Sequence, residues 1–195
     1  MNTLIETVLK QVGGNALEEI ARKVGVDPGT AQKAIATVAP LLLAALSRNS
    51  STPEGAQSLH QALVNDHDGS ILDDVMGFLD NPQAANGAGI LRHVLGDQQQ
   101  SVQSGLTKTT GMDAASVAQV LEMAAPLIMG ALGRTTQQQG LNASDLSDLL
   151  RVQQQKAQQE DPDLMGVLGQ LLGSGGKENV ASQVGSLLGK LFGGR

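Results

Sequence analysis

The chain lacks several residue types, and each absence excludes a class of structure or chemistry. Its 195 residues include no Cys, Trp or Tyr, and the only aromatic side chains are Phe78 and Phe192. Without cysteine there are no disulfides and no thiolate metal sites, and the redox state of the compartment is left open. The core has to be packed from Leu, Ala, Val, Ile and Met, a composition that favours closely packed helices.

Long apolar runs and positive charge are also scarce. No run of 18 apolar residues occurs, so we expect no transmembrane segment. The first residues hold no basic cluster and include Glu6, so we expect no signal peptide and a cytoplasmic location. The net charge of −6 argues against non-specific binding to nucleic acid, which needs clustered Lys and Arg.

A segment near the N-terminus recurs 86 residues further along the chain. Residues 24–48 and 110–134 are identical at eight of 25 positions. Most of the other positions that are apolar in one segment are also apolar in the other. The identical residues of the first copy are Gly25, Asp27, Ala39, Pro40, Leu41, Ala45, Leu46 and Arg48. The repeat predicts an internal pseudo-duplication, with copies spanning about residues 15–79 and 101–172.

The repeated segments are predicted to be long helices at 28–47 and 114–133. Asp27 and Asp113 stand where a carboxylate caps a helix N-terminus, and Pro at the first helical position is tolerated. Both helices are apolar nearly all round, which predicts that they are buried. Pro40 and Pro126 lie inside them, and each is expected to kink its helix because it cannot donate to the preceding turn.

The remaining periodic segments also indicate helices. They lie at 53–64, at 71–79 after a cap at Asp68–Ser70, at 89–96 and at 97–108. No stretch alternates with a period of two, so no sheet is expected. We therefore predict an all-α protein, an irregular multi-helix array.

The C-terminal part differs in composition, so we divide the chain into a duplicated helical domain at 1–158 and a Gly/Leu-rich tail at 159–195. Gly173–Gly176 reads as a flexible linker. Glycines at four-residue spacing share one helix face, where another backbone can approach closely. We expect the tail to mediate self-association or binding to an unknown protein partner through Gly185, Leu187, Leu188, Gly189, Leu191 and Phe192.

Several motifs in sequence order are similar to those of the bacterial YidB-like family, small helical proteins of unknown function. They are the Ala-Pro-Leu segments at 39–41 and 125–127, and the segments 68–72, 89–96 and 110–113. The resemblance covers roughly residues 1–150 and implies an all-helical fold. It implies no activity and no catalytic residues.

No catalytic constellation is found, and we predict that the chain is not an enzyme and needs no cofactor. The Asp68–Gly69 segment does not fit a calcium loop, because Val64 and Val75 would stand where acids are required. Gly173–Lys177 does not fit a phosphate loop, because the position needing its first Gly is Leu171. A transition-metal site at His60, His67 and Asp68 is the alternative to a polar turn, which we favour.

Two alternative functions involve other partners. Residues 17–35 have the spacing of a helix-turn-helix, in which Gly29, Thr30, Gln32 and Lys33 would read DNA. Only Lys33 among these is basic, so binding to nucleic acid is the weaker hypothesis. Residues 179–194 form an amphipathic segment that could contact a membrane surface, but their nearly neutral charge predicts weak attraction to lipid.

Overall fold

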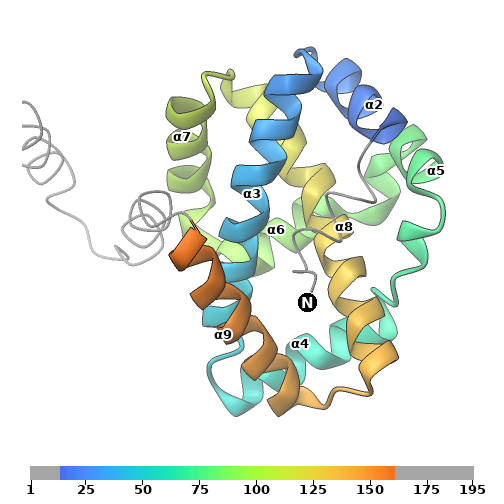
Figure 1. The fold of residues 1–195 in the computed structure, drawn as a ribbon, viewed down its shortest axis with the longest axis vertical. Helices are drawn as coiled ribbons and strands as arrows, with labels where there is room; N and C mark the ends of the chain where they lie inside the picture. Colours follow the sequence, from blue (N-terminus) through green and yellow to red (C-terminus); the bar gives the residue numbers. More distant parts are fainter. Residues whose placement is uncertain (1–13, 161–195) are drawn as a thin grey trace, which may run out of the picture.

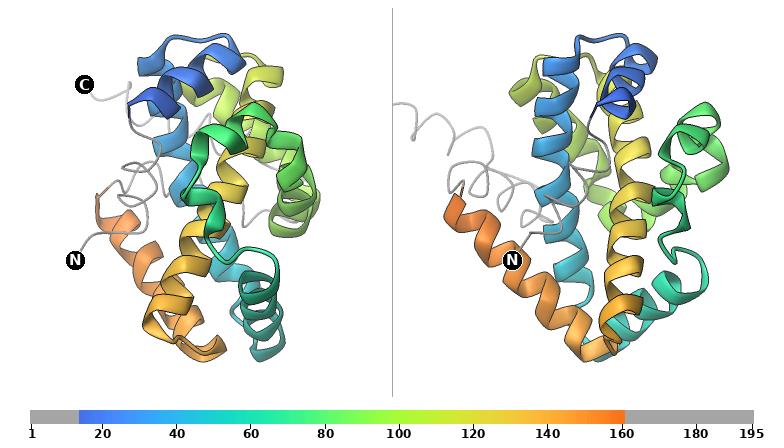
Figure 2. Two further views of the ribbon diagram at one scale, coloured as in Figure 1. Left: turned by 90° about the vertical axis from the view of Figure 1, so that its right-hand side faces the viewer. Right: turned by 45° about the vertical axis from the view of Figure 1, so that its right-hand side comes forward.

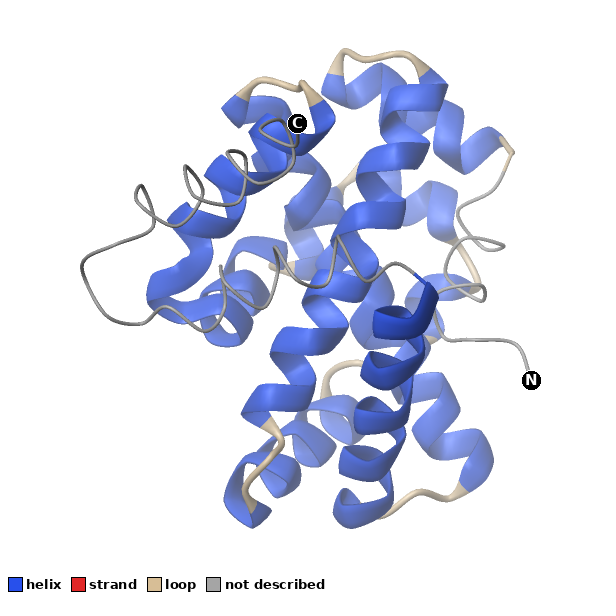
Figure 3. Cartoon of the chain, turned by 60° about the vertical axis from the view of Figure 1, so that its left-hand side comes forward, coloured by secondary structure: helices blue, strands red, loops and turns tan. Residues whose placement is uncertain are grey.

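The computed structural model describes residues 14–160, and in this part of the chain every regular element is helical. Predictions for the tail residues from 161 onward lie outside the described residues. The predicted all-α fold is confirmed (Figures 1 and 3). The α-helices are α2 (Asn15–Val24), α3 (Pro28–Asn49), α4 (Pro53–Asn65), α5 (Val75–Asp80), α6 (Gly87–Leu95), α7 (Gln99–Thr110), α8 (Ala114–Gln139) and α9 (Ala143–Glu160). Short 3-10 turns are η1 (Ser70–Leu72), η2 (Pro82–Ala85) and η3 (Gly96–Gln98).

The two repeated segments form the central helices α3 and α8, which pack against each other. The Asp27 carboxylate accepts a hydrogen bond from the Thr30 amide at 3.0 Å, and Asp113 accepts from two amides at the start of α8. Both predicted helix starts are therefore confirmed. Pro40 and Pro126 lie inside the helices and both are buried. The kinks, and the superposition of the two copies, remain predictions.

Shorter helices surround the central pair. Figure 2 shows α3 and α8 side by side, with α4 and α9 at one end and α2 and α7 at the other. The end of α3 is tied to α9 by Ser147 Oγ, which donates to the Ser50 carbonyl at 2.8 Å. On the face of α8, α6 makes one of the most extensive helix contacts of the fold.

The predicted single helix at 71–79 is wrong, because the structure divides this segment into η1 and α5. The Asp68 carboxylate does cap the segment, accepting from the Ser70 amide at 2.9 Å. A second cap interrupts it, since Asp74 accepts from the Gly77 amide at 2.8 Å and so begins α5. A Cβ at Gly77 would lie 2.2 Å from the Asp74 carboxylate, so a larger residue there would require the Asp74 side chain to shift.

By length and composition alone, α3 and α8 are each apolar enough to cross a membrane. In the fold, 67% and 78% of their most apolar windows are buried against other helices. Central helices of a helical domain meet the same criterion, so the criterion is weak evidence for a membrane-spanning role.

Leu42→Asp is expected to unfold the domain. Leu42 is buried in α3, with 2% of its surface exposed. A buried carboxylate without a partner costs several kcal/mol, a large share of the roughly 5–15 kcal/mol that stabilises a typical domain. Thermal and urea unfolding followed by circular dichroism would measure the loss. Gln32→Asp, at an exposed position of the same helix, is the control and should melt near the wild type. Cooperative melting of Leu42→Asp at the wild-type midpoint would contradict the assignment of Leu42 to the buried core.

Candidate functional site: a groove between α4 and α6

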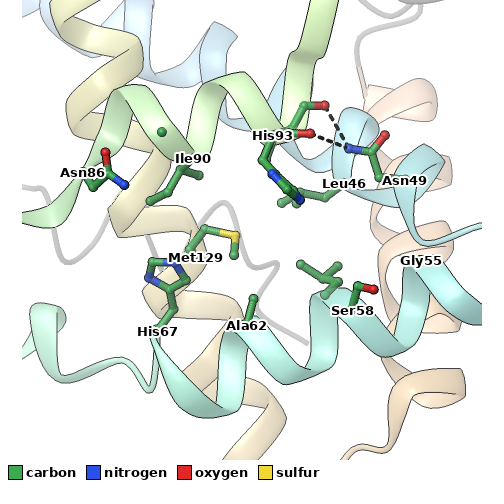
Figure 4. Close-up of a pocket in the computed structure, with 13 residues that line it drawn as sticks. Leu46, Asn49, Gly55, Ser58, Ala62, His67, Asn86, Ile90, His93 and Met129 are labelled. Atoms are coloured by element: carbon green, nitrogen blue, oxygen red, sulfur yellow. Dashed lines mark hydrogen bonds between the residues drawn. The ribbon is translucent and has the colours of Figure 1, made fainter.

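A pocket of about 620 Å³ lies between α4 and α6, both of which pack on α8. Met129 of α8 and Leu46 of α3 also line it, and Figure 4 shows the side chains around it. The α4 side provides Gly55, Ser58, Leu59 and Ala62, followed by His67 beyond the helix end. The opposite side provides Asn86, Gly89, Ile90, His93 and Val94, with Asn49 at one end. We call this the α4–α6 groove.

The end of α3 holds α4 and α6 together. Asn49 Nδ2 donates to the Val94 carbonyl at 2.9 Å and to the His93 carbonyl at 3.4 Å, which anchors the last turn of α6. A Cβ at Gly55 would lie 2.0 Å from the Asn49 carbonyl oxygen, so α4 can approach this corner only with glycine there. The same short stretch of α3 therefore fixes one end of both groove walls.

The loop after α4 is pressed against α8, and this contact positions His67. A Cβ at Gly133 would lie 1.6 Å from the His67 carbonyl oxygen, and Gly69 has a φ of +95°. Arg134 Nη2 donates to the Gly69 carbonyl at 2.6 Å and pairs with Asp73 Oδ1 at 2.6 Å. The loop is thus held by its backbone, and the His67 side chain is left facing the groove (Figure 4).

The start of α6 is seated on α8 at the turn that Pro126 weakens. Pro126 has no N–H, so the Glu122 carbonyl lacks its usual donor within the helix. A Cβ at Gly87 would lie 1.9 Å from that carbonyl oxygen, which shows how closely the α6 backbone approaches. The preceding Asn86 has a φ of +51°, and asparagine tolerates this left-handed conformation better than most residues.

Asn86 also links the groove to two neighbouring hollows. One, of about 500 Å³, lies beside Gly87 and Glu122, and the other, of about 250 Å³, lies over Pro126 and the 66–71 loop. Asn86 lines all three, and His67 lines the groove and the smaller hollow. The concave surface therefore continues along α8 beyond the groove itself.

The groove lining contains no Asp, Glu, Lys or Arg. Partial burial holds the pKa of His67 below its usual value, and the nearby Asp66 carboxylate opposes this shift only in part. Ser58 is the one hydroxyl in the lining, and within residues 14–160 it forms no hydrogen bond with either groove histidine. The arrangement therefore offers a partly apolar surface without carboxylate, ammonium or guanidinium groups.

Other residues singled out in the sequence are used structurally. His60 Nε2 lies 2.9 Å from the Leu141 carbonyl oxygen, and Asp68 caps the Ser70 amide. Among the described residues there is no group of three or more His, Cys, Asp or Glu that could hold a metal. The metal alternative at His60, His67 and Asp68 therefore finds no support.

The helix-turn-helix spacing corresponds to α2, a left-handed turn at Gly25 and the start of α3. Gly29, Gln32 and Lys33 are exposed there. The Thr30 hydroxyl is bonded to the Asp27 carboxylate. On α2, Arg22 and Lys23 both pair with Glu19, which reduces the positive charge available to a phosphate backbone.

Sequence reasoning missed the groove, because its walls come from segments far apart in the chain. The useful signals were small or turn-forming residues: Gly133 in an otherwise apolar helix and the Asn86–Gly87 pair before α6. An isolated glycine in a helical pattern often has a packing reason, and here each one marks a close contact between backbones.

A protein-family model described as "Bacterial protein of unknown function (DUF937)" matches residues 6–135, or 130 of the 195 residues. No curated protein and no solved structure matches the chain. Like the family resemblance noted from the sequence, the match is to a bacterial family of unknown function. The matched range contains the whole lining of the groove.

The pKa of His67 predicts a specific dependence of stability on pH. Because burial lowers its folded-state pKa, the unfolded chain takes up the proton first as pH falls below about 6.5. The contribution of neutral His67 to the free energy of unfolding is therefore complete above that pH. It is lost as the pH falls through the folded-state pKa of His67. Urea unfolding of the wild type and of His67→Gln at pH 7.5 and 5.5 should show a smaller loss for the variant. Equal losses would contradict the prediction, and NMR titration should give a His67 pKa below 6.5.

Proposed function

The chain belongs to this bacterial DUF937 family, and we propose that it is a non-enzymatic, cytoplasmic interaction protein that associates with other copies of itself. The α4–α6 groove is the observation that carries the proposal. It offers a concave surface that combines aliphatic side chains with polar ones, two of them histidines, and contains no Asp, Glu, Lys or Arg. Its volume of about 620 Å³ is of the order that binding clefts have.

A groove between two helices is a common receptor for a third helix. Such grooves accept the apolar side of an amphipathic segment, through anchors spaced three and four residues apart. Leu59 and Ile90 are only partly buried on the two walls, and so retain apolar surface for a partner. The fold therefore has a place for an apolar segment supplied from outside the domain.

The tail supplies a segment of the required kind. Its apolar residues Leu187, Leu188, Leu191 and Phe192 are too few to form a core of their own, and short helices are marginally stable in water. In the proposed role, Gly185 and Gly189 allow a close approach to another backbone. The tail thereby gives each copy an element with which to bind another.

Deletion of residues 175–195 is expected to lower the mass of the protein in solution. The deletion removes the proposed association element but none of the buried residues of the described domain. Light scattering after size-exclusion chromatography should show a multimer for the full chain and a monomer for the truncated chain. Circular dichroism should show nearly unchanged helicity and melting for residues 1–174.

Two results would oppose this function. If the full chain is monomeric at all accessible concentrations, the proposal of self-association is wrong. A truncated chain that melts much earlier would make the tail part of the intramolecular core.

A further inference from the structure

We propose that the α4–α6 groove of one copy binds residues Val184–Phe192 of a second copy. This inference rests on the proposed function and names the contact through which self-association occurs. It is carried by three properties of the chain. They are the spacing of the tail residues, the absence of Asp, Glu, Lys and Arg from the groove lining and from the apolar face of the segment, and the length of chain beyond α9.

The spacing of the tail residues fits a helix bound along a groove. Val184, Leu187, Leu188 and Leu191 stand at positions i, i+3, i+4 and i+7, the pattern by which an amphipathic helix presents one apolar face. Gly185 and Gly189 follow two of these anchors directly. The groove wall has its own small residues, Gly55 and Ala62 on α4 and Gly89 on α6, so two backbones can come close there.

The charge pattern is compatible with binding of this segment. The groove lining has no Asp, Glu, Lys or Arg, so a charged group placed inside it would lose water without gaining a partner. Within Val184–Phe192 the one charged residue is Lys190, which in a helical arrangement stands outside the face formed by Val184, Leu187, Leu188 and Leu191. Residues 164–171 have the same spacing and no charge, but only three residues separate them from Glu160. The length of the preceding chain, and not the charge, therefore distinguishes Val184–Phe192.

The length of the chain allows the segment to reach a second copy. The described part ends with α9 at Glu160, and 23 residues lie between Glu160 and Val184. An extended chain of that length spans up to roughly 80 Å, about twice the diameter expected for a domain of this size. Two copies can therefore exchange tails, so that each gives one segment and receives one, and both contacts form in a single association.

Paired substitutions test the groove and the segment separately. Ala62→Asp places a carboxylate on the groove wall, whereas Gln61→Asp places it on an exposed position of the same helix. Leu188→Asp alters the apolar face of the segment, whereas Ser186→Asp adds the same charge outside that face. In the full chain, Ala62→Asp and Leu188→Asp should each weaken the dimer about tenfold or more in sedimentation equilibrium, since each buries an unpaired charge. The two controls should match the wild type, and circular dichroism should show that all four variants remain folded.

Cross-linking between copies tests the contact directly, because the natural chain has no cysteine and each variant carries a single thiol. Ser58→Cys at the groove edge is mixed with Gln183→Cys at the start of the segment, and a short bis-maleimide is added. A covalent heterodimer is expected. The control mixture uses Ser144→Cys, an exposed position at the start of α9, with Gln183→Cys, and should give little product.

The outcomes separate this inference from the proposed function. If Ala62→Asp matches Gln61→Asp while deletion of 175–195 still produces monomers, the function stands and the groove is not the docking site. If a chain carrying both Ser58→Cys and Gln183→Cys cross-links within itself at low concentration and stays monomeric, docking in the second copy is overturned. A monomeric full chain removes both proposals.

Discussion

Close approach of other backbones to α8 is the constraint on which the rest of the structure depends. The His67 carbonyl oxygen occupies the place that a Cβ at Gly133 would take, and at Gly130 the Ile71 side chain occupies the corresponding place. With larger residues there, the loop after α4 could not lie on the helix, and Arg134 could not hold the Gly69 carbonyl. The loop after α4 and the position of η1 therefore depend on two glycines of one helix. Small residues cost helical stability, about 1 kcal/mol for each glycine relative to alanine, so the tertiary contacts have to offset this cost.

The groove follows from the way in which α4 and α6 are seated. The loop after α4 is held at Gly133, while α6 begins where Gly87 meets the Glu122 carbonyl, about three helical turns earlier on α8. Asn49 joins the two helices at the other end, through the carbonyls of the last turn of α6. The walls are thus fixed at their ends by backbone contacts, and the side chains between them are left partly uncovered. A groove defined by backbone contacts keeps its shape when lining side chains are exchanged, which is why the Ala62→Asp variant should remain folded.

Local signals in the sequence were sufficient for much of the fold and for none of the groove. Asp27 and Asp113 mark helix starts because a carboxylate one position before a helix finds free amides, and both caps form as predicted. The burial of α3 and α8 was predictable from apolar residues that leave no polar face. The division at 70–80 was missed because Asp74 was read as part of a helix rather than as a second cap. The groove depends on contacts such as that of Gly133 with His67. A local sequence pattern does not show which distant segment of the backbone packs against a glycine.

The two copies of the repeat diverge at the positions that build the groove. Gly130 and Gly133 of α8 correspond to Ala44 and Ser47 of α3, each of which carries a Cβ. Arg134 holds the loop after α4, whereas its counterpart Arg48 is bonded to Gln98. The helix that follows each central helix differs accordingly: α4 ends after 13 residues, whereas α9 continues for 18. The similarity in sequence between α3 and α8 therefore does not extend to the residues on which the loop after α4 rests.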